Sequence, residues 1–99
     1  MFVGTLTLDI LLGDVHSLKE KRGIVKPILA ELDKRAGVGA AETGYMDLHR
    51  RAEIGVAVVA ATAARVNEVL DDLEGTVAWR PEIELLSVRR RLRSDEDDE

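Results

Sequence analysis

Two stretches in which apolar residues recur at every second position constrain this chain more than any other feature of its sequence. In residues 2–12, FVGTLTLDILL, one set of alternate positions is glycine or large and apolar, while the other set includes two threonines and Asp9. Residues 51–60, RAEIGVAVVA, alternate in the same way. Because successive side chains of a β-strand point to opposite faces, each stretch is predicted to form a half-buried strand.

Two other segments have the spacing of amphipathic helices. Ser17 and Glu20 match the capping-box pattern, and the apolar residues that follow recur along one side over residues 18–36. Thr62 can cap a second helix, whose apolar positions keep helical spacing over residues 63–77. Each helix is therefore predicted to lie with one side against the sheet.

Two weaker strands complete the pattern. Residues 38–45 are rich in Gly and Ala, and the alternation of residues 82–92 slips at Leu85–Leu86, which predicts a β-bulge or a change of face. The order strand, helix, strand, strand, helix, strand predicts an α+β, ferredoxin-like βαββαβ sandwich, in which a four-stranded antiparallel sheet carries both helices on one face.

Length and charge predict one domain with a short tail. Ninety-nine residues suit a single domain. The net charge is −5, yet the last five residues are all acidic and the remaining chain holds 14 basic and 14 acidic groups. We therefore expect a ferredoxin-like domain over residues 1–93 and an acidic flexible tail over residues 94–99.

Composition also narrows the chemistry. The absence of cysteine excludes disulfides and thiolate metal sites, and the two histidines lie too far apart in sequence to predict a metal site, so no metal or cofactor is expected. The longest uncharged stretch, residues 54–64, is 11 residues, whereas a membrane span needs about 20. We expect a cytoplasmic protein without a membrane partner.

Three motifs resemble a known family. The sequence HSLKEKR after the first strand, DL at residues 47–48 and RAEIGVAVVA from residue 51 resemble the YlxP-like family of small bacterial proteins, a domain of unknown function. The resemblance covers residues 1 to about 92 and implies a ferredoxin-like fold. Genes of this family often lie near those of ribosome-binding factor A and translation initiation factor two, which implies a ribosomal or ribosome-assembly partner. The resemblance supplies no catalytic residues.

The start of the first predicted helix is the first candidate site. Cations there oppose the helix macrodipole by about 0.3–1 kcal/mol each when exposed. Lys21 falls within the apolar stripe, so its side chain is expected to snorkel past the end of the sheet. The cations can be offset internally by Asp9, Asp14 or Glu20, or externally by a bound anion. The candidate anion-binding residues are His16, Ser17, Lys19, Lys21 and Arg22.

The sheet face that the helices leave uncovered is the second candidate. Its two central strands present small and mostly apolar residues, whereas open sheet faces are usually more polar. RNA-binding sheets of this topology carry aromatic and basic residues that these positions lack, so an RNA platform is not favoured. A second copy of the chain is expected to cover the surface, although an exposed face is also tolerated. The candidate dimer-face residues are Val3, Thr5, Thr7, Gly55, Ala57 and Val59.

Two further clusters carry weaker signals. Asp47, His49 and Arg51 surround the predicted turn at residues 47–50, where a turn-forming aspartate and an arginine paired to an acid are favoured over a general base. The arginines of residues 89–93 can contact an RNA backbone, but the acidic tail beside them argues against it. We therefore expect a non-enzymatic interaction module, a homodimer associated with translation or ribosome maturation. The alternative is a regulatory protein that binds a small anion or ligand at the Ser17 helix start.

Overall fold

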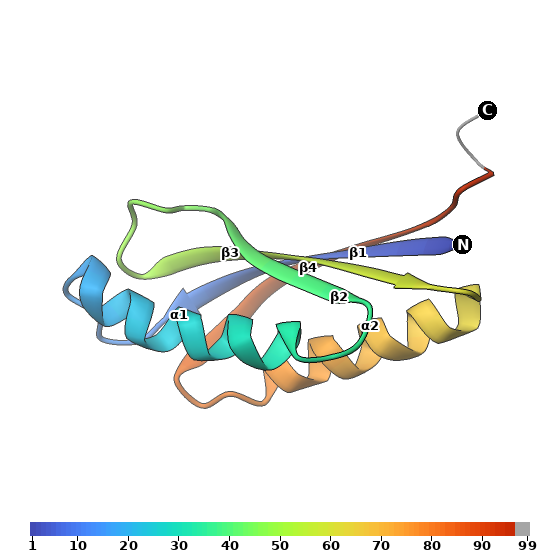
Figure 1. The fold of residues 1–99 in the computed structure, drawn as a ribbon. Coiled ribbons are helices and arrows are strands. Elements are labelled where there is room, and N and C mark those ends of the chain that lie inside the picture. The colour runs from blue at the N-terminus through green and yellow to red at the C-terminus, as the bar shows by residue number, and fades with distance from the viewer. Residues whose placement is uncertain (97–99) are drawn as a thin grey trace.

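The ferredoxin-like architecture is confirmed. The computed structural model describes residues 1–96 and contains one antiparallel sheet in the order β2-β3-β1-β4. Both helices lie on the same side of the sheet (Figure 1). The elements are β1 Phe2–Leu12, α1 Leu18–Asp33, β2 Val38–Gly44, β3 Arg51–Ala60, α2 Ala63–Ala78 and β4 Ile83–Ser94.

Both helices begin at the predicted caps. The Ser17 hydroxyl accepts a hydrogen bond from the Glu20 N–H at 3.1 Å, and the Thr62 hydroxyl accepts one from the Arg65 N–H at 3.1 Å. Helix α1 ends at Asp33, three residues before the predicted end. The chain turns into β2 at Gly37, whose φ of +78° suits glycine.

The core lies between the sheet and the two helices. The predicted inward face of β1 is confirmed, because Leu6, Leu8 and Ile10 have no exposed surface. Gly4 continues this face and lets α2 approach closely, since a Cβ there would lie 2.3 Å from the Val66 side chain. The buried side chains that the helices contribute include Val25, Ile28, Leu32, Val66, Leu70, Leu73 and Val77.

Two strands are irregular. In β4 the pairing with β1 shifts between Ser87 and Leu85, which leaves Leu86 as the extra residue and confirms the predicted bulge. In β2 the pairing with β3 shifts between Glu42 and Gly44, which the sequence did not predict. This second irregularity leaves Thr43 without a register partner, and it affects the uncovered face described below.

The C-terminal strand runs further than predicted. It extends to Ser94, one residue into the segment assigned to the tail. The Asp95 N–H then donates to the Met1 carbonyl at 3.0 Å, and the Asp95 carboxylate lies 3.2 Å from the N-terminal ammonium. The remainder of the predicted flexible tail, residues 97–99, lies outside the described residues.

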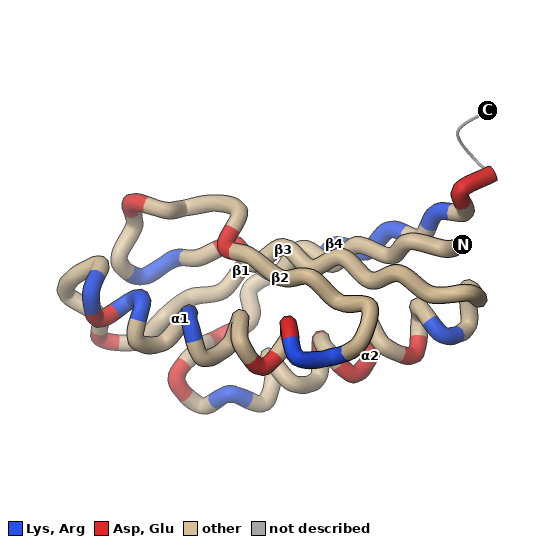
Figure 2. The backbone as a smooth tube through the Cα atoms, viewed as in Figure 1, with Lys and Arg blue, Asp and Glu red and all other residues tan. Residues whose placement is uncertain are grey.

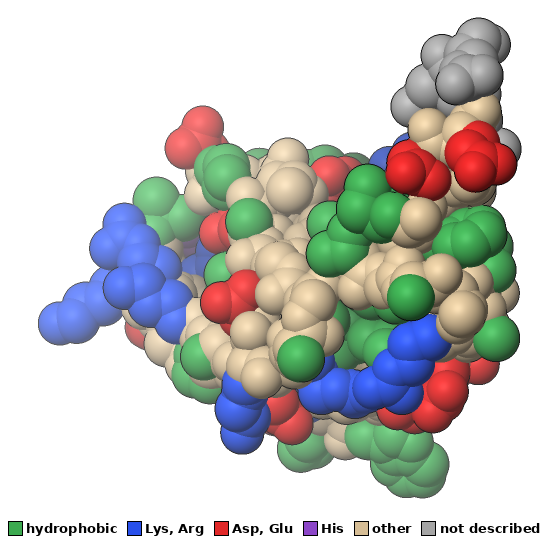
Figure 3. Space-filling model, turned by 45° about the vertical axis from the view of Figure 1, so that its right-hand side comes forward, with side chains coloured by type: hydrophobic (Ala, Val, Ile, Leu, Met, Phe, Trp, Pro, Cys, Tyr) green, Lys and Arg blue, Asp and Glu red, His purple; other side chains and the backbone are tan. Residues whose placement is uncertain are grey.

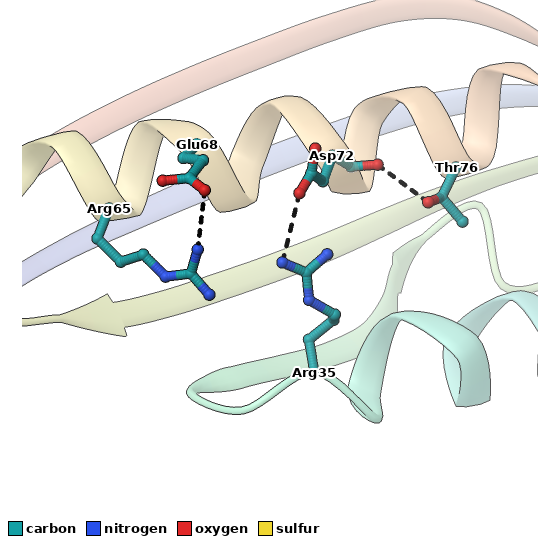
Figure 4. A network of polar contacts seen from close by, with 5 residues as sticks. All are labelled: Arg35, Arg65, Glu68, Asp72 and Thr76. Carbon is teal, nitrogen blue, oxygen red and sulfur yellow. Dashed lines mark hydrogen bonds and ion pairs between the residues drawn. The ribbon is translucent and has the colours of Figure 1, made fainter.

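One surface ion pair joins the end of α1 to α2, and another lies within α2. Arg35, just after α1, contacts Asp72 of α2 at 3.4 Å, and Arg65 contacts Glu68 at 3.1 Å (Figure 4). The Thr76 hydroxyl donates to the Asp72 carbonyl at 2.9 Å. Both acids are exposed on the outer side of α2, and both are paired.

Arg80 connects the start of β4 to α1 through ion pairs. Its guanidinium binds the Glu31 carboxylate of α1 and lies 3.0 Å from the Glu82 carboxylate. The hydrogen bond from Arg80 lowers the pKa of Glu82. The Glu82 carboxylate therefore stays ionised to lower pH than an isolated glutamate.

Candidate interaction surface: the uncovered sheet face

The uncovered face of the sheet has small neutral residues at its centre. Thr5 pairs with Ala57, and Thr7 pairs with Gly55. Paired residues of neighbouring strands point to the same face, so these four residues face away from the core. β2 extends the two rows with Gly39 and Ala41. Together with Thr43 and Glu53 these residues line a shallow trough of about 530 Å³.

The second bulge explains why β3 has a glycine at this centre. A Cβ on Gly55 would lie 2.7 Å from the Thr43 methyl group. Thr43, which has no register partner, leans over Gly55, and its hydroxyl donates to the Glu53 carboxylate at 2.8 Å. The trough is therefore shaped by local packing between β2 and β3.

All six candidate dimer-face residues lie on this one face. Val3 pairs with Val59 one row beyond Thr5 and Ala57, so the apolar surface continues toward the chain's N-terminus. Val59 is 47% exposed. The sequence pattern thus placed these residues together, whereas occupancy by a second copy remains a prediction.

Strand β4 adds a basic edge that the sequence reasoning did not place here. Arg89, Arg91 and Arg93 pair with Thr7, Thr5 and Val3, so they lie on the uncovered face. Arg90 points to the other side and contacts Asp71 of α2 at 2.8 Å. Within residues 1–96, neither Arg89 nor Arg91 forms a side-chain hydrogen bond or an ion pair. The alternation of RRRLR, residues 89–93, indicated that three of these arginines share one face of a strand. Which face they share became clear only from the pairing of β4 with β1.

The opposite end of the same face is acidic. Asp9 pairs in register with Glu53, and Glu84 lies opposite Leu11 one row further. The Asp9 carboxylate receives two hydrogen bonds from Arg51, at 2.6 and 3.1 Å. Within residues 1–96, Glu84 forms no side-chain hydrogen bond or ion pair. The uncovered face thus has a basic end on β4 and an acidic end that includes Glu84.

Of the three candidate turn residues, Arg51 alone has a specific contact among the described residues. Its hydrogen bonds to Asp9 raise the pKa of Arg51, and its guanidinium lies 4.5 Å from the centre of the Tyr45 ring. Asp47 and His49 are exposed on the β2–β3 loop, and neither contacts another side chain through a polar group within residues 1–96. The three residues therefore do not converge on one point.

Lys21 corrects one expectation at the helix start. It was expected to snorkel past the end of the sheet, yet the residue is buried, with 2% of its surface exposed. Its ammonium donates to the Tyr45 carbonyl at 2.7 Å and lies 2.8 Å from the Glu42 carboxylate. The physical reason is that the β2–β3 loop folds over the first turn of α1 and encloses the ammonium. Sequence reasoning missed Glu42 as the partner because it lies 21 residues away on a predicted strand.

The other members of the candidate anion site are arranged around the protein's own acids. The Glu20 carboxylate accepts the His16 N–H at 3.0 Å, and the His16 ring lies 2.9 Å from the Asp14 carboxylate. Lys19 and Arg22 are exposed. Because Lys21 points inward and a carboxylate already accepts the backbone N–H before the cap, the geometry favours internal compensation over an external anion.

Two further classes of site find no support in the described part of the chain. Residues 1–96 contain no cluster of three or more His, Asp or Glu side chains that could hold a metal ion. Neither helix described there is long and apolar enough to cross a membrane.

Comparisons with known proteins agree with the motifs in the sequence. The family described as "Protein of unknown function (DUF503)" matches residues 3–90. The "Uncharacterized protein YlxP" of Bacillus subtilis (strain 168) is 30% identical over 82 residues, which cover 83% of this chain and 89% of that protein. Neither description assigns an enzymatic activity.

A solved structure shows the same fold without a close sequence relationship. The "De novo designed protein Foldit4" superimposes with a TM-score of 0.56 at 11% identity, over 96% of this chain and 99% of the designed one. This likeness concerns the fold alone. The extent of the family match and the identity to the Bacillus subtilis protein place this chain in the YlxP-like, DUF503 family.

Proposed function

We propose that this protein is a homodimeric interaction module whose uncovered sheet face binds the same face of a second copy. The observation that carries the proposal is the small, neutral centre of that face, around Thr7 and Gly55. The module acts by binding rather than by catalysis, because its charged groups are either paired, as Asp9 is with Arg51, or stand on an open surface.

The size and shape of the face suit a second copy. Small side chains allow two sheets to approach to about 10 Å, the usual separation of stacked sheets. Four strands at about 4.8 Å spacing and about 30 Å in length give roughly 600 Å² per copy, or roughly 1,200 Å² in total. That area lies at the lower end of the range for specific interfaces, so we expect a dimer that dissociates on dilution.

A matched pair of substitutions tests the dimer. Ala57→Arg places a long cation at the centre of the uncovered face, whereas Ala64→Arg places the same side chain on the exposed side of α2. Light scattering at tens of micromolar should give the dimer mass for the natural chain and for Ala64→Arg, and the monomer mass for Ala57→Arg. A monomer mass for the natural chain at these concentrations would contradict the proposal.

The second part of the proposal is a cytoplasmic ribosomal or ribosome-assembly partner. The resemblance to the YlxP-like family supports it through the neighbouring genes. The end of the molecule where α1 begins also supports it, because lysines and arginines gather there (Figures 2 and 3). Lys19 and Arg22 are exposed at this end, beside a loop in which Tyr45, Met46 and Leu48 are also exposed. A basic surface with apolar side chains suits a ribonucleoprotein particle.

Co-purification from cells at low salt, followed by a sucrose gradient, tests this partner. The natural chain should migrate with ribosomal particles, and the double variant Lys19→Glu/Arg22→Glu should remain at the top of the gradient. The control Lys34→Glu/Arg65→Glu changes the net charge by the same amount, just after the end of α1 and in the first turn of α2. Equal migration of both double variants, or no migration of the natural chain, would contradict a partner at this end.

A further inference from the structure

The charges of the uncovered face are separated along its strands. Arg91 pairs with Thr5, whereas Glu84 pairs with Leu11, so the two levels are six positions apart along β1. Six residues of a strand span about 20 Å. Arg91 and Glu84 are therefore too far apart to pair within one copy. The basic end of such a face is complementary in charge to the acidic end of a second copy that is turned end for end.

Two arrangements place these faces together with twofold symmetry and aligned strands. A twofold axis across the strands reverses the two ends, so the arginines of one copy lie over the acidic end of the other. A twofold axis along the strands places the acidic end of one copy over the acidic end of the other. Asp9 then lies over the partner's Glu53, and the arginines lie over small residues of β2. Like charges placed across an interface are costly, and opposite charges fix the register.

We propose that the two copies stack about a twofold axis across the strands, between the levels of Thr7 and Asp9, so that Arg91 of each copy pairs with Glu84 of the other. This inference rests on the proposed sheet-face dimer and adds its orientation. With the axis at this level, Arg89 lies over the level of Asp9, and Thr7 lies close to its own counterpart. Arg89 and Arg91 thereby gain partners that residues 1–96 of their own copy do not supply.

Charge reversal followed by mixing tests the orientation. Arg91→Glu and Glu84→Arg each replace both symmetry-related pairs by like charges, so each variant alone should weaken the dimer by about 10-fold or more. In an equimolar mixture, one heterodimer contains one reversed pair and one native pair, both attractive. The mixture should therefore recover an affinity within about threefold of the natural chain. Lys26→Glu, on the exposed side of α1, is the control and should not alter the affinity.

The outcomes separate this inference from the dimer itself. The experiment measures dissociation constants by sedimentation velocity, with thermal unfolding as a check that each variant is folded. A natural dimer that tolerates both reversals, or a mixture that fails to recover, would overturn the orientation and leave the dimer intact. A natural chain that stays monomeric would overturn both. A monomer that binds single-stranded RNA through Arg91 would also overturn both and assign the face to nucleic acid.

Discussion

The two faces of strand β1 differ by a single step along the chain. Leu8 has no exposed surface and packs beneath the helices, whereas its neighbour Thr7 lies on the uncovered face. On the inner face, packing constrains the size of each side chain, because each one fills a space between the sheet and a helix. The uncovered face is open to contact, because its small residues leave room for another surface. Substitutions on the inner face should therefore change stability, and those on the outer face should change association.

The largest expected effect is on the inner face. Leu8→Ala removes a fully buried side chain and leaves a cavity, so the free energy of unfolding should fall by about 3 kcal/mol. Urea denaturation measures this change. Thr7→Ala, one residue away, should alter the free energy of unfolding by less than about 0.5 kcal/mol. Equal losses for the two variants would contradict the separation of the faces.

The buried ion pair of Lys21 gives the next effect. Lys21→Met leaves the Tyr45 carbonyl and the Glu42 carboxylate without the ammonium that contacts both, which should cost about 2–3 kcal/mol. In the double variant Lys21→Met/Glu42→Met, apolar packing replaces the pair, so part of the loss should be recovered. Thermal and urea unfolding of the two variants measure the recovery. A double variant less stable than Lys21→Met would contradict it.

Gly4 tests how closely the inner face packs. A Cβ there would overlap the Val66 side chain at 2.3 Å and the Leu70 side chain at 2.9 Å, so Gly4→Ala should lower the free energy of unfolding by about 1–3 kcal/mol. Gly39, on the uncovered side of β2, has no heavy atom within 4 Å of the corresponding Cβ position. Gly39→Ala should therefore be neutral in the same denaturation experiment. A neutral Gly4→Ala would show that α2 lies further from the sheet.

The smallest effect on stability is expected just before β4, where Arg80 binds Glu82. Because the folded-state pKa of Glu82 is lowered, the pair contributes stability above the ordinary glutamate pKa of 4.5, and this contribution disappears as pH falls through the lower folded value. Glu82→Gln should cost about 0.2–1 kcal/mol at neutral pH, with no difference from the natural chain at pH 2. Urea unfolding across this pH range measures it. A difference that persists at pH 2 would assign the effect to packing instead.

The sequence predicted the fold because its signals are local. The alternation of residues 2–12 and the caps at Ser17 and Thr62 depend on neighbours a few positions away, and the structure contains the elements at those places. The bulge at Leu86 was also visible, because the slip in alternation occurs within four residues.

The contacts of the site could be predicted less well because they depend on distant pairing. The contact between Lys21 and Glu42 joins α1 to β2, next to the bulge in that strand, and so depends on how distant segments pack. The arginine edge required the knowledge that β4 lies beside β1, since the central strands alone show no basic residue at the middle of the uncovered face. The pairing of β1 with β3 puts the six neutral residues on one face, as their alternation predicted, but no local pattern specifies what contacts that face.

Cross-linking through Thr7→Cys tests the face-to-face dimer most directly. The natural sequence has no cysteine, so a single thiol at this position reports only on the uncovered face. A short bismaleimide should convert most of Thr7→Cys to a covalent dimer at micromolar concentration, while Ala64→Cys on the exposed side of α2 should remain monomeric. If Thr7→Cys cross-links no better than Ala64→Cys, the uncovered face does not bind a second copy.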